Sequence, residues 1–256
     1  MSKIIAFANQ KGGVAKTTTA WAMAAGLANR GYKVLAVDLD PQGNLSQSFN
    51  ADAFELPTVY NLLRGECSID NAVQHLVGLD VISANVILAS AESELSQTGK
   101  EHKLKEALIP VRGHYDYILL DAPPSLGVLT ANALTAADEV VVPTTASIFA
   151  TMGINELYNT VTRIQRYCNA SLVIRGILLT KYNPRANVNA DMKELIERLG
   201  AAIKAPVFST FIRNSVIVEQ AQANSVDLFA FKGNSPVAED YAAFIEEYLK
   251  GGNVNG

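Results

Sequence analysis

The residues from Asn9 to Thr19 have the types and spacing of a phosphate-binding loop. They read Asn-Gln-Lys-Gly-Gly-Val-Ala-Lys-Thr-Thr-Thr and directly follow a short apolar run, Ile4 to Ala8. Glycines allow the backbone to turn so that successive N–H groups point at phosphate oxygens. The helix that begins here adds favourable partial charge. Lys16 is therefore expected to bridge the β- and γ-phosphates of a nucleotide, and the Thr17 hydroxyl to bind Mg²⁺.

Two positions of this loop depart from the general pattern, which has glycine at residues 10 and 15. Gln10 and Ala15 stand there instead. If residue 15 needs a positive φ angle, alanine costs on the order of 1–2 kcal/mol. If it needs only a close approach, one methyl group can be absorbed. Because every side-chain ligand remains, we expect nucleotide binding to survive, but a nucleotide-binding switch with little hydrolysis stays open as an alternative.

Acidic residues follow two other apolar runs. Asp38 and Asp40 come after Val34 to Val37, and Asp121 comes after Tyr117 to Leu120. Taken alone, the first pair could form a turn, and Asp121 could cap a helix. The phosphate-binding loop before the pair favours a functional role for it. Pro123 and the apolar run before Asp121 favour a metal-binding role there.

Short apolar runs alternate with helical patterns along the chain. The runs are almost continuously apolar, as strands are when both faces of a parallel sheet are covered. They span residues 4–8, 34–37, 79–83, 117–120, 140–142 and 173–179, and the clearest helical patterns span 17–29, 154–168, 191–199 and 236–249. This alternation predicts an α/β fold with a doubly wound, mostly parallel β-sheet and helices on both faces. We expect one domain over residues 1–250, short helices within 42–78 and a disordered tail over 251–256.

Composition excludes several classes of protein. A net charge of −4 excludes a generally basic nucleic-acid coat, although a local basic patch stays possible. The two cysteines, Cys67 and Cys168, exclude a disulfide framework and a multi-cysteine metal site within one chain. The first apolar run is too short for a signal peptide, and the longest uncharged segment, 122–137, contains two prolines. A cytoplasmic protein without a membrane partner is predicted.

The pattern Lys-Gly-Gly-x-x-Lys-Thr-Thr, with a lysine at its start, resembles the deviant Walker loop of the ParA/MinD superfamily of P-loop ATPases. The resemblance extends in register from Lys3 to Leu249. The later segments that are similar to the ParA/Soj branch are Val37–Asn44, Tyr115–Ser125, Gly176–Arg185 and Phe211–Asn214 with Glu219. The segment Thr144–Ser147 departs from the family, which often has Gln and Glu there.

The resemblance implies an ATPase that uses ATP and Mg²⁺ and has three catalytic residues. Lys11 is the signature lysine, which reaches across an ATP-sandwich homodimer to the partner's phosphates, like a finger supplied in trans. Lys16 acts on the phosphates of its own chain, and Asp40 orients the attacking water. Asp121 holds Mg²⁺ through its water shell, with Thr17 as the direct ligand. The implied nucleotide-binding residues are Lys11, Gly12, Gly13, Val14, Ala15, Lys16, Thr17, Thr18 and Asn183.

Basic residues concentrate between residues 160 and 215, a stretch that contains nine basic and three acidic residues. The rest of the chain has twelve basic and twenty-two acidic residues. Phosphate contacts in this stretch would be independent of DNA sequence and sensitive to salt. In ParA-like proteins the loop that matches Pro184-Arg185-Ala186 contributes to nonspecific DNA binding by the dimer. Arg185, Arg213 and Lys181 are the candidates for DNA contact.

The resemblance therefore implies an ATPase for DNA partition or cargo positioning that is cytoplasmic and nucleoid-associated. Its ATP-bound dimer would bind double-stranded DNA nonspecifically, and hydrolysis stimulated by a ParB-like or other adaptor would release it. A MinD-like membrane-positioning ATPase is the alternative, and it would need a basic amphipathic helix at its C-terminus. After Lys250 the sequence offers only Gly, Asn and Val.

Overall fold

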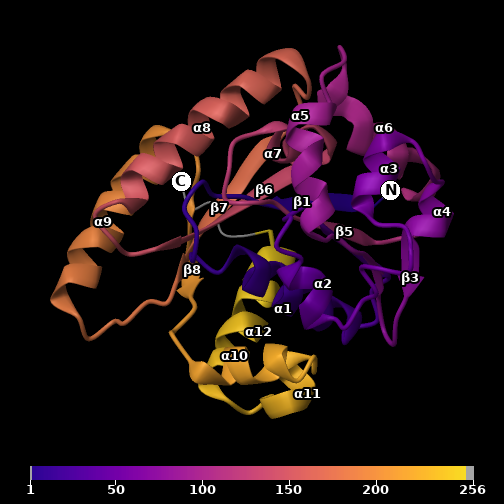
Figure 1. Ribbon diagram of the computed structural model, residues 1–256. Coiled ribbons are helices and arrows are strands. Elements are labelled where there is room, and N and C mark those ends of the chain that lie inside the picture. The colour runs from indigo at the N-terminus through magenta and orange to yellow at the C-terminus, as the bar shows by residue number, and fades with distance from the viewer. Residues whose placement is uncertain (1, 252–256) are drawn as a thin grey trace.

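The computed structural model describes residues 2–251, which form an eight-stranded sheet flanked by helices (Figure 1). The strand order is β3-β4-β2-β5-β1-β6-β7-β8. β3 pairs with β4 in the antiparallel sense, and the other neighbours are parallel. The strands are β1 Lys3–Phe7, β2 Val34–Asp38, β3 Val73–His75, β4 Asp80–Ile82, β5 Tyr117–Asp121, β6 Glu139–Thr145, β7 Val173–Thr180 and β8 Val207–Phe211. The predicted doubly wound, mostly parallel sheet is confirmed.

Two hydrophobic cores lie on the two faces of this sheet, because successive strand side chains point to opposite faces. Ile4 and Ala6 of β1 enter one core, whereas Ile5 and Phe7 enter the other. The first core is covered by α3 Val59–Arg64, α4 Ile69–Ala72, α5 Ala91–Glu94, α6 Lys103–Leu108, α7 Val128–Ala136, α8 Ala150–Tyr167 and α9 Asn187–Ala202. The second is covered by α1 Lys16–Ala28, α2 Asn44–Ser48, α10 Val216–Ala223, α11 Leu228–Lys232 and α12 Pro236–Leu249. In Figure 1 these two groups of helices lie above and below the sheet.

The remaining helical segments are short 3₁₀ helices at Val86–Ser90, Lys100–His102 and Ile109–Val111. Within residues 2–251, no helix combines the length and the apolar character that crossing a membrane requires. A disordered tail was predicted over residues 251–256, and residues 252–256 lie outside the described part of the chain.

All six predicted strands and all four predicted helices are present; α12 has its predicted ends, and the ends of the other elements differ by a few residues. β6 continues to Thr145, because the hydroxyl-bearing Thr144 is fully buried in the sheet. The strands β3 and β8 were not predicted from the sequence. Both are short edge strands with polar residues, and an edge strand needs no continuous apolar pattern. α7 was not predicted either, because eight of its nine residues are buried and no polar face marks the helical period.

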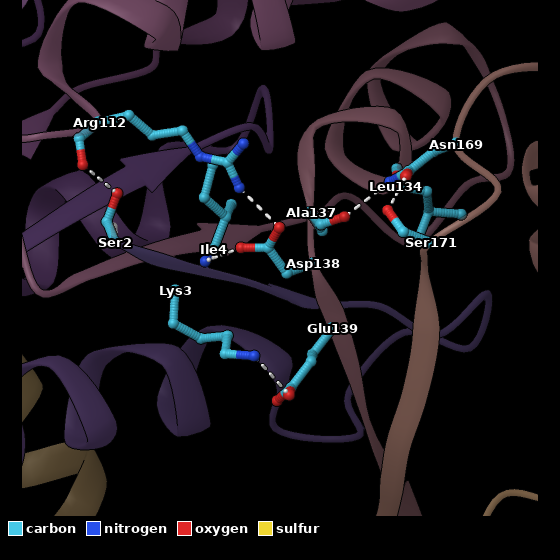
Figure 2. Close-up of polar contacts among 10 residues, drawn as sticks. All are labelled: Ser2, Lys3, Ile4, Arg112, Leu134, Ala137, Asp138, Glu139, Asn169 and Ser171. Carbon is cyan, nitrogen blue, oxygen red and sulfur yellow. Dashed lines mark hydrogen bonds and ion pairs between the residues drawn. The ribbon is translucent and has the colours of Figure 1, made fainter.

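Polar contacts hold the amino ends of β1 and β6 in register (Figure 2). The Asp138 carboxylate accepts hydrogen bonds from the Ile4 amide at 2.9 Å and from the Arg112 guanidinium at 2.6 Å. Beside it, Lys3 and Glu139 form an ion pair at 2.9 Å. Because these contacts fix one end of each strand, the carboxyl ends at the opposite edge of the sheet are held in fixed relative positions.

Candidate nucleotide-binding site

Several of the predicted site residues meet at the carboxyl edge of the sheet, where the strand order reverses. β1 lies between β5 and β6, so the chain crosses β1 when it passes from one half of the sheet to the other. In open α/β sheets, ligands bind in the crevice outside the strands at this point. The crevice here is a cavity of about 320 Å³. Its lining includes Gly12, Gly13, Ala15, Lys16, Thr17, Thr18, Asp40, Thr180, Lys181, Arg213, Glu219 and Tyr241.

Two side chains fasten the phosphate-binding loop to the neighbouring strands. The Asn9 amide donates to the Pro143 carbonyl of β6 at 2.8 Å, and its oxygen accepts from the Lys11 amide at 3.0 Å. The buried Thr180 hydroxyl at the end of β7 lies 3.0 Å from the Val14 carbonyl and is shared with a β6 carbonyl. No role for Thr180 was predicted from the sequence. A threonine at the end of an apolar strand carries no signal that its hydroxyl binds a loop far away in sequence.

Ala15 adopts the left-handed conformation, with φ 61° and ψ 35°, immediately before α1. The first of the two possibilities for this position is therefore correct: it needs a positive φ, not merely a close approach. Side chains disfavour this region, because Cβ crowds the following carbonyl oxygen. Gly13 also has a positive φ, 73°, and the space around its missing side chain is open. The loop thus keeps one strained residue, while its carbonyl accepts from the Thr19 amide and hydroxyl at 2.9 and 2.6 Å.

Lys16 points back over the loop from the first turn of α1. Its ammonium lies 3.5 Å from the Lys11 carbonyl oxygen, and the residue is buried. Burial lowers the pKa of Lys16, and the negative charges of Asp121 and Asp40 partly oppose that shift. A buried cation that faces a loop of N–H groups is an arrangement that binds phosphate.

Asp38 is fully buried and holds the turn that carries Asp40. Its carboxylate accepts from the Asp40 amide at 3.1 Å, and from the Ser46 amide and hydroxyl at 2.9 and 2.7 Å. Burial raises the pKa of Asp38 to about 6, although these hydrogen bonds lower it. The Ser46 hydroxyl also accepts from the Ala84 amide at 2.9 Å. Asp38 thus positions the backbone of the loop in which Asp40 lies at the edge of the cavity.

Asp121 is the residue whose surroundings fit a metal ion. It is fully buried, and neither carboxylate oxygen has a hydrogen-bond partner among the described residues. Burial and the neighbouring Asp38 raise the pKa of Asp121 well above its usual range, while Thr17 and Lys16 nearby offset part of the shift. A carboxylate kept unpaired in the interior is costly. Together with the Thr17 hydroxyl it supplies the oxygen donors that Mg²⁺ and its bound waters prefer.

Lys11 stands apart from the other loop residues. Its ammonium donates to the Ser147 hydroxyl at 3.0 Å and lies 5.9 Å from the centre of the Phe149 ring. Among the described residues, those that line the cavity do not include Lys11. The charge of Lys11 is therefore directed out of the cavity of its own chain.

The remaining predicted residues lie after β7 and β8. Lys181 has a positive φ of 50° and lines the cavity, whereas Arg185 is exposed on the following loop. The Asn183 side chain accepts from the Arg185 amide at 3.0 Å. Arg213 forms a two-pronged ion pair with Asp240, with both distances 2.7 Å, and also lines the cavity. DNA contact by these basic residues and nucleotide binding by Asn183 stay predictions.

Replacing Ala15 by glycine should stabilise the protein. Glycine removes the strain of the left-handed conformation, which is larger than the entropy it adds to the unfolded chain, so we expect a gain of about 0.5–1 kcal/mol in the free energy of unfolding. Urea denaturation measures it. Ala201→Gly, on an exposed face of α9, is the control and should destabilise. If Ala15→Gly lost as much stability as the control, the conclusion that the backbone of Ala15 is strained would be wrong.

Asp121→Asn should also stabilise the protein at neutral pH by about 1–3 kcal/mol, because it removes a carboxyl group that must either keep its charge in the interior or take up a proton on folding. A raised pKa means that the native carboxyl binds a proton more readily than the unfolded one. The free energy of unfolding of the wild type therefore rises as the pH falls. The difference in this free energy between the wild type and Asp121→Asn should narrow between about pH 8 and about pH 5. Asp191→Asn, at an exposed carboxylate, serves as the control. Thermal unfolding across this pH range measures the gap; a constant gap would show that Asp121 does not titrate in this way.

Comparison with known proteins agrees with this geometry. A family model described as an AAA domain matches residues 2–174. The chain is 39% identical over 256 residues to the sporulation initiation inhibitor protein Soj of Bacillus subtilis, covering 98% of this chain and 100% of Soj. It is 41% identical over 225 residues to the chromosome partitioning protein ParA of Caulobacter vibrioides, covering 86% of this chain and 83% of that protein.

A solved structure has the same fold together with bound ligands. Cobyrinic acid a,c-diamide synthase from Mycobacterium smegmatis, with bound ADP and magnesium, has a TM-score of 0.85 and 34% identity, covering 98% of this chain and 95% of that one. The resemblance inferred from the loop and the later motifs is thus confirmed. The chain belongs to the ParA/MinD family of P-loop ATPases.

Proposed function

We propose that this chain is an ATPase that partitions DNA or positions another large cargo by switching between a monomer and an ATP-bound homodimer. The observation that carries the proposal is the direction of Lys11. Lys16, Thr17 and Asp40 line one cavity, whereas the Lys11 ammonium donates to Ser147, which is not among the residues that line it. A lysine directed outward in this way is suited to a phosphate that another subunit holds.

Each residue of the site then has a distinct task. The amides of the loop and the Lys16 ammonium bind the β- and γ-phosphates of ATP. Thr17 and Asp121 would hold Mg²⁺, which when bound neutralises charge on those phosphates. Asp40, at the end of the turn that Asp38 fixes, orients the attacking water. Lys11 of the second subunit stabilises the charge that develops on the transferred phosphoryl group.

The ATP-bound dimer is proposed to bind DNA and to be retained on it. The name of one relative, the chromosome partitioning protein ParA of Caulobacter vibrioides, supports a partition role. Arg185 is exposed on the loop after β7, where a second copy of the loop in the dimer would double the positive charge. A ParB-like or other adaptor would stimulate hydrolysis and release the dimer, and we propose that the protein is cytoplasmic and nucleoid-associated.

Asp40→Ala should trap the ATP dimer on DNA. The variant should bind ATP within about twofold of wild type, because Asp40 acts on the water rather than on the phosphates. Its dissociation from a DNA-coated surface with Mg²⁺ and ATP should be slower by about tenfold or more. Phosphate release and surface-plasmon resonance measure the two effects. Normal ATP turnover by the variant would assign Asp40 another role.

Arg185→Glu should weaken retention of the ATP-bound protein on nonspecific double-stranded DNA by about tenfold at fixed salt, with ATP affinity unchanged. Lys232→Glu is the matched control, because it reverses an exposed charge on α11, away from the β7 loop. The wild type should be retained only with ATP, and less as salt rises. If wild type were not retained, the DNA-based function would be refuted; if Arg185→Glu matched the control, only this residue would be removed from the DNA site.

A further inference from the structure

Lys11 contacts two residues just before α8: Ser147, in the segment that departs from the family pattern, and Phe149. The ammonium donates to Ser147 at 3.0 Å, and the Thr145 hydroxyl lies 3.3 Å from the same Ser147 oxygen. The Phe149 ring lies beside the ammonium, 5.9 Å from it to the ring centre, within the range of a cation–π contact. One cation is thus held between a hydroxyl and an aromatic face.

Contacts with Asn9 fix the positions of both the Lys11 backbone and the start of α8. The Lys11 amide donates to Asn9, whose own amide is bound to β6. The first turn of α8 lies against the same asparagine: a side chain at Gly153 would approach the Asn9 oxygen to 3.1 Å. The start of the loop and the start of α8 therefore have a defined spacing, which the Lys11 side chain spans.

The surface around this lysine is apolar and exposed. Ile148, Phe149 and Met152 are 69%, 64% and 61% exposed, within two turns of one another at the start of α8. Contiguous exposed apolar residues are characteristic of surfaces that bind another macromolecule. Lys11 projects into this surface, so whatever covers the apolar residues also meets the ammonium.

We propose that Ser147 and Phe149 are positioning residues that aim Lys11 at a second copy of this chain, which covers Ile148, Phe149 and Met152. This inference rests on the proposed function, since a lysine supplied in trans has a use only in the dimer. A free lysine side chain loses much rotamer freedom when it is immobilised at an interface. Holding the ammonium in advance removes part of that cost, so the dimer forms at a lower protein concentration.

Removing the hydroxyl in Ser147→Ala should raise the protein concentration for half-dimerisation about fivefold. Analytical ultracentrifugation with Mg²⁺ and a hydrolysis-resistant ATP analogue measures it, and the affinity of the monomer for the analogue should stay within twofold. Ser147→Thr, which keeps the hydroxyl, should restore dimerisation. Phe149→Leu, which keeps an apolar side chain but removes the ring, should act like Ser147→Ala. Thr162→Ala removes a hydroxyl from an exposed position of the same helix and should change nothing.

A second measurement reports on the contact without any dimer. The rate at which an amine-reactive reagent modifies Lys11, read by mass spectrometry without nucleotide, should rise about threefold in Ser147→Ala and stay constant in Thr162→Ala. If wild type formed no ATP-dependent dimer, the proposed function would fail, and a raised labelling rate would still establish the contact. If the wild type dimerised, but Ser147→Ala and Phe149→Leu had the same protein concentration for half-dimerisation as the wild type, the positioning role would be overturned.

Discussion

The buried carboxylate of Asp121 sets the electrostatics of the whole site. It is fully buried without a hydrogen-bond partner among residues 2–251, and it stands beside Asp38 on the neighbouring strand. Burial raises the pKa of both acids, the charge of Asp38 raises the pKa of Asp121 further, and the buried Lys16 offsets only part of the shift at Asp121. A fold tolerates such a group when a cation completes the site. The parallel pairing of β2 and β5, fixed at the amino edge by contacts such as Asp138 with Ile4, is what brings the acids together.

The loop above these acids stores strain that its neighbours hold in place. Ala15 keeps a left-handed backbone because the Thr19 hydroxyl and amide bind its carbonyl, and because Thr180 binds the carbonyl of the preceding residue. Strained residues persist where the surrounding structure over-determines them, and they concentrate at functional sites. In this loop the strained residue and its neighbours Gly12, Gly13 and Lys16 line the cavity.

The basic stretch illustrates how tertiary structure distributes charge. Counted along the sequence, residues 160–215 form a positive segment, yet Arg175 reaches Glu139 and the Tyr248 carbonyl, and Arg213 is paired with Asp240. On α9, Arg198 and Lys193 pair with glutamates one turn away. Exposed ion pairs of this kind contribute little to stability, but they reduce the free positive charge. Arg185 is exposed on the loop after β7, and its contact with DNA phosphates stays a prediction.

The sequence by itself determined the fold class and a candidate nucleotide site, because both are local patterns: apolar runs, helical periods, and a glycine-rich loop between a strand and a helix. Lys16, Thr17, Asp40 and Asp121 became candidate site residues for the same reason. Only the tertiary structure decided that Ala15 has a positive φ, that Thr180 anchors the loop and that Lys11 contacts Ser147. The short edge strands β3 and β8 and the buried α7 also needed it. These features depend on groups up to 166 residues apart in the chain, and no local spacing encodes the distance between them.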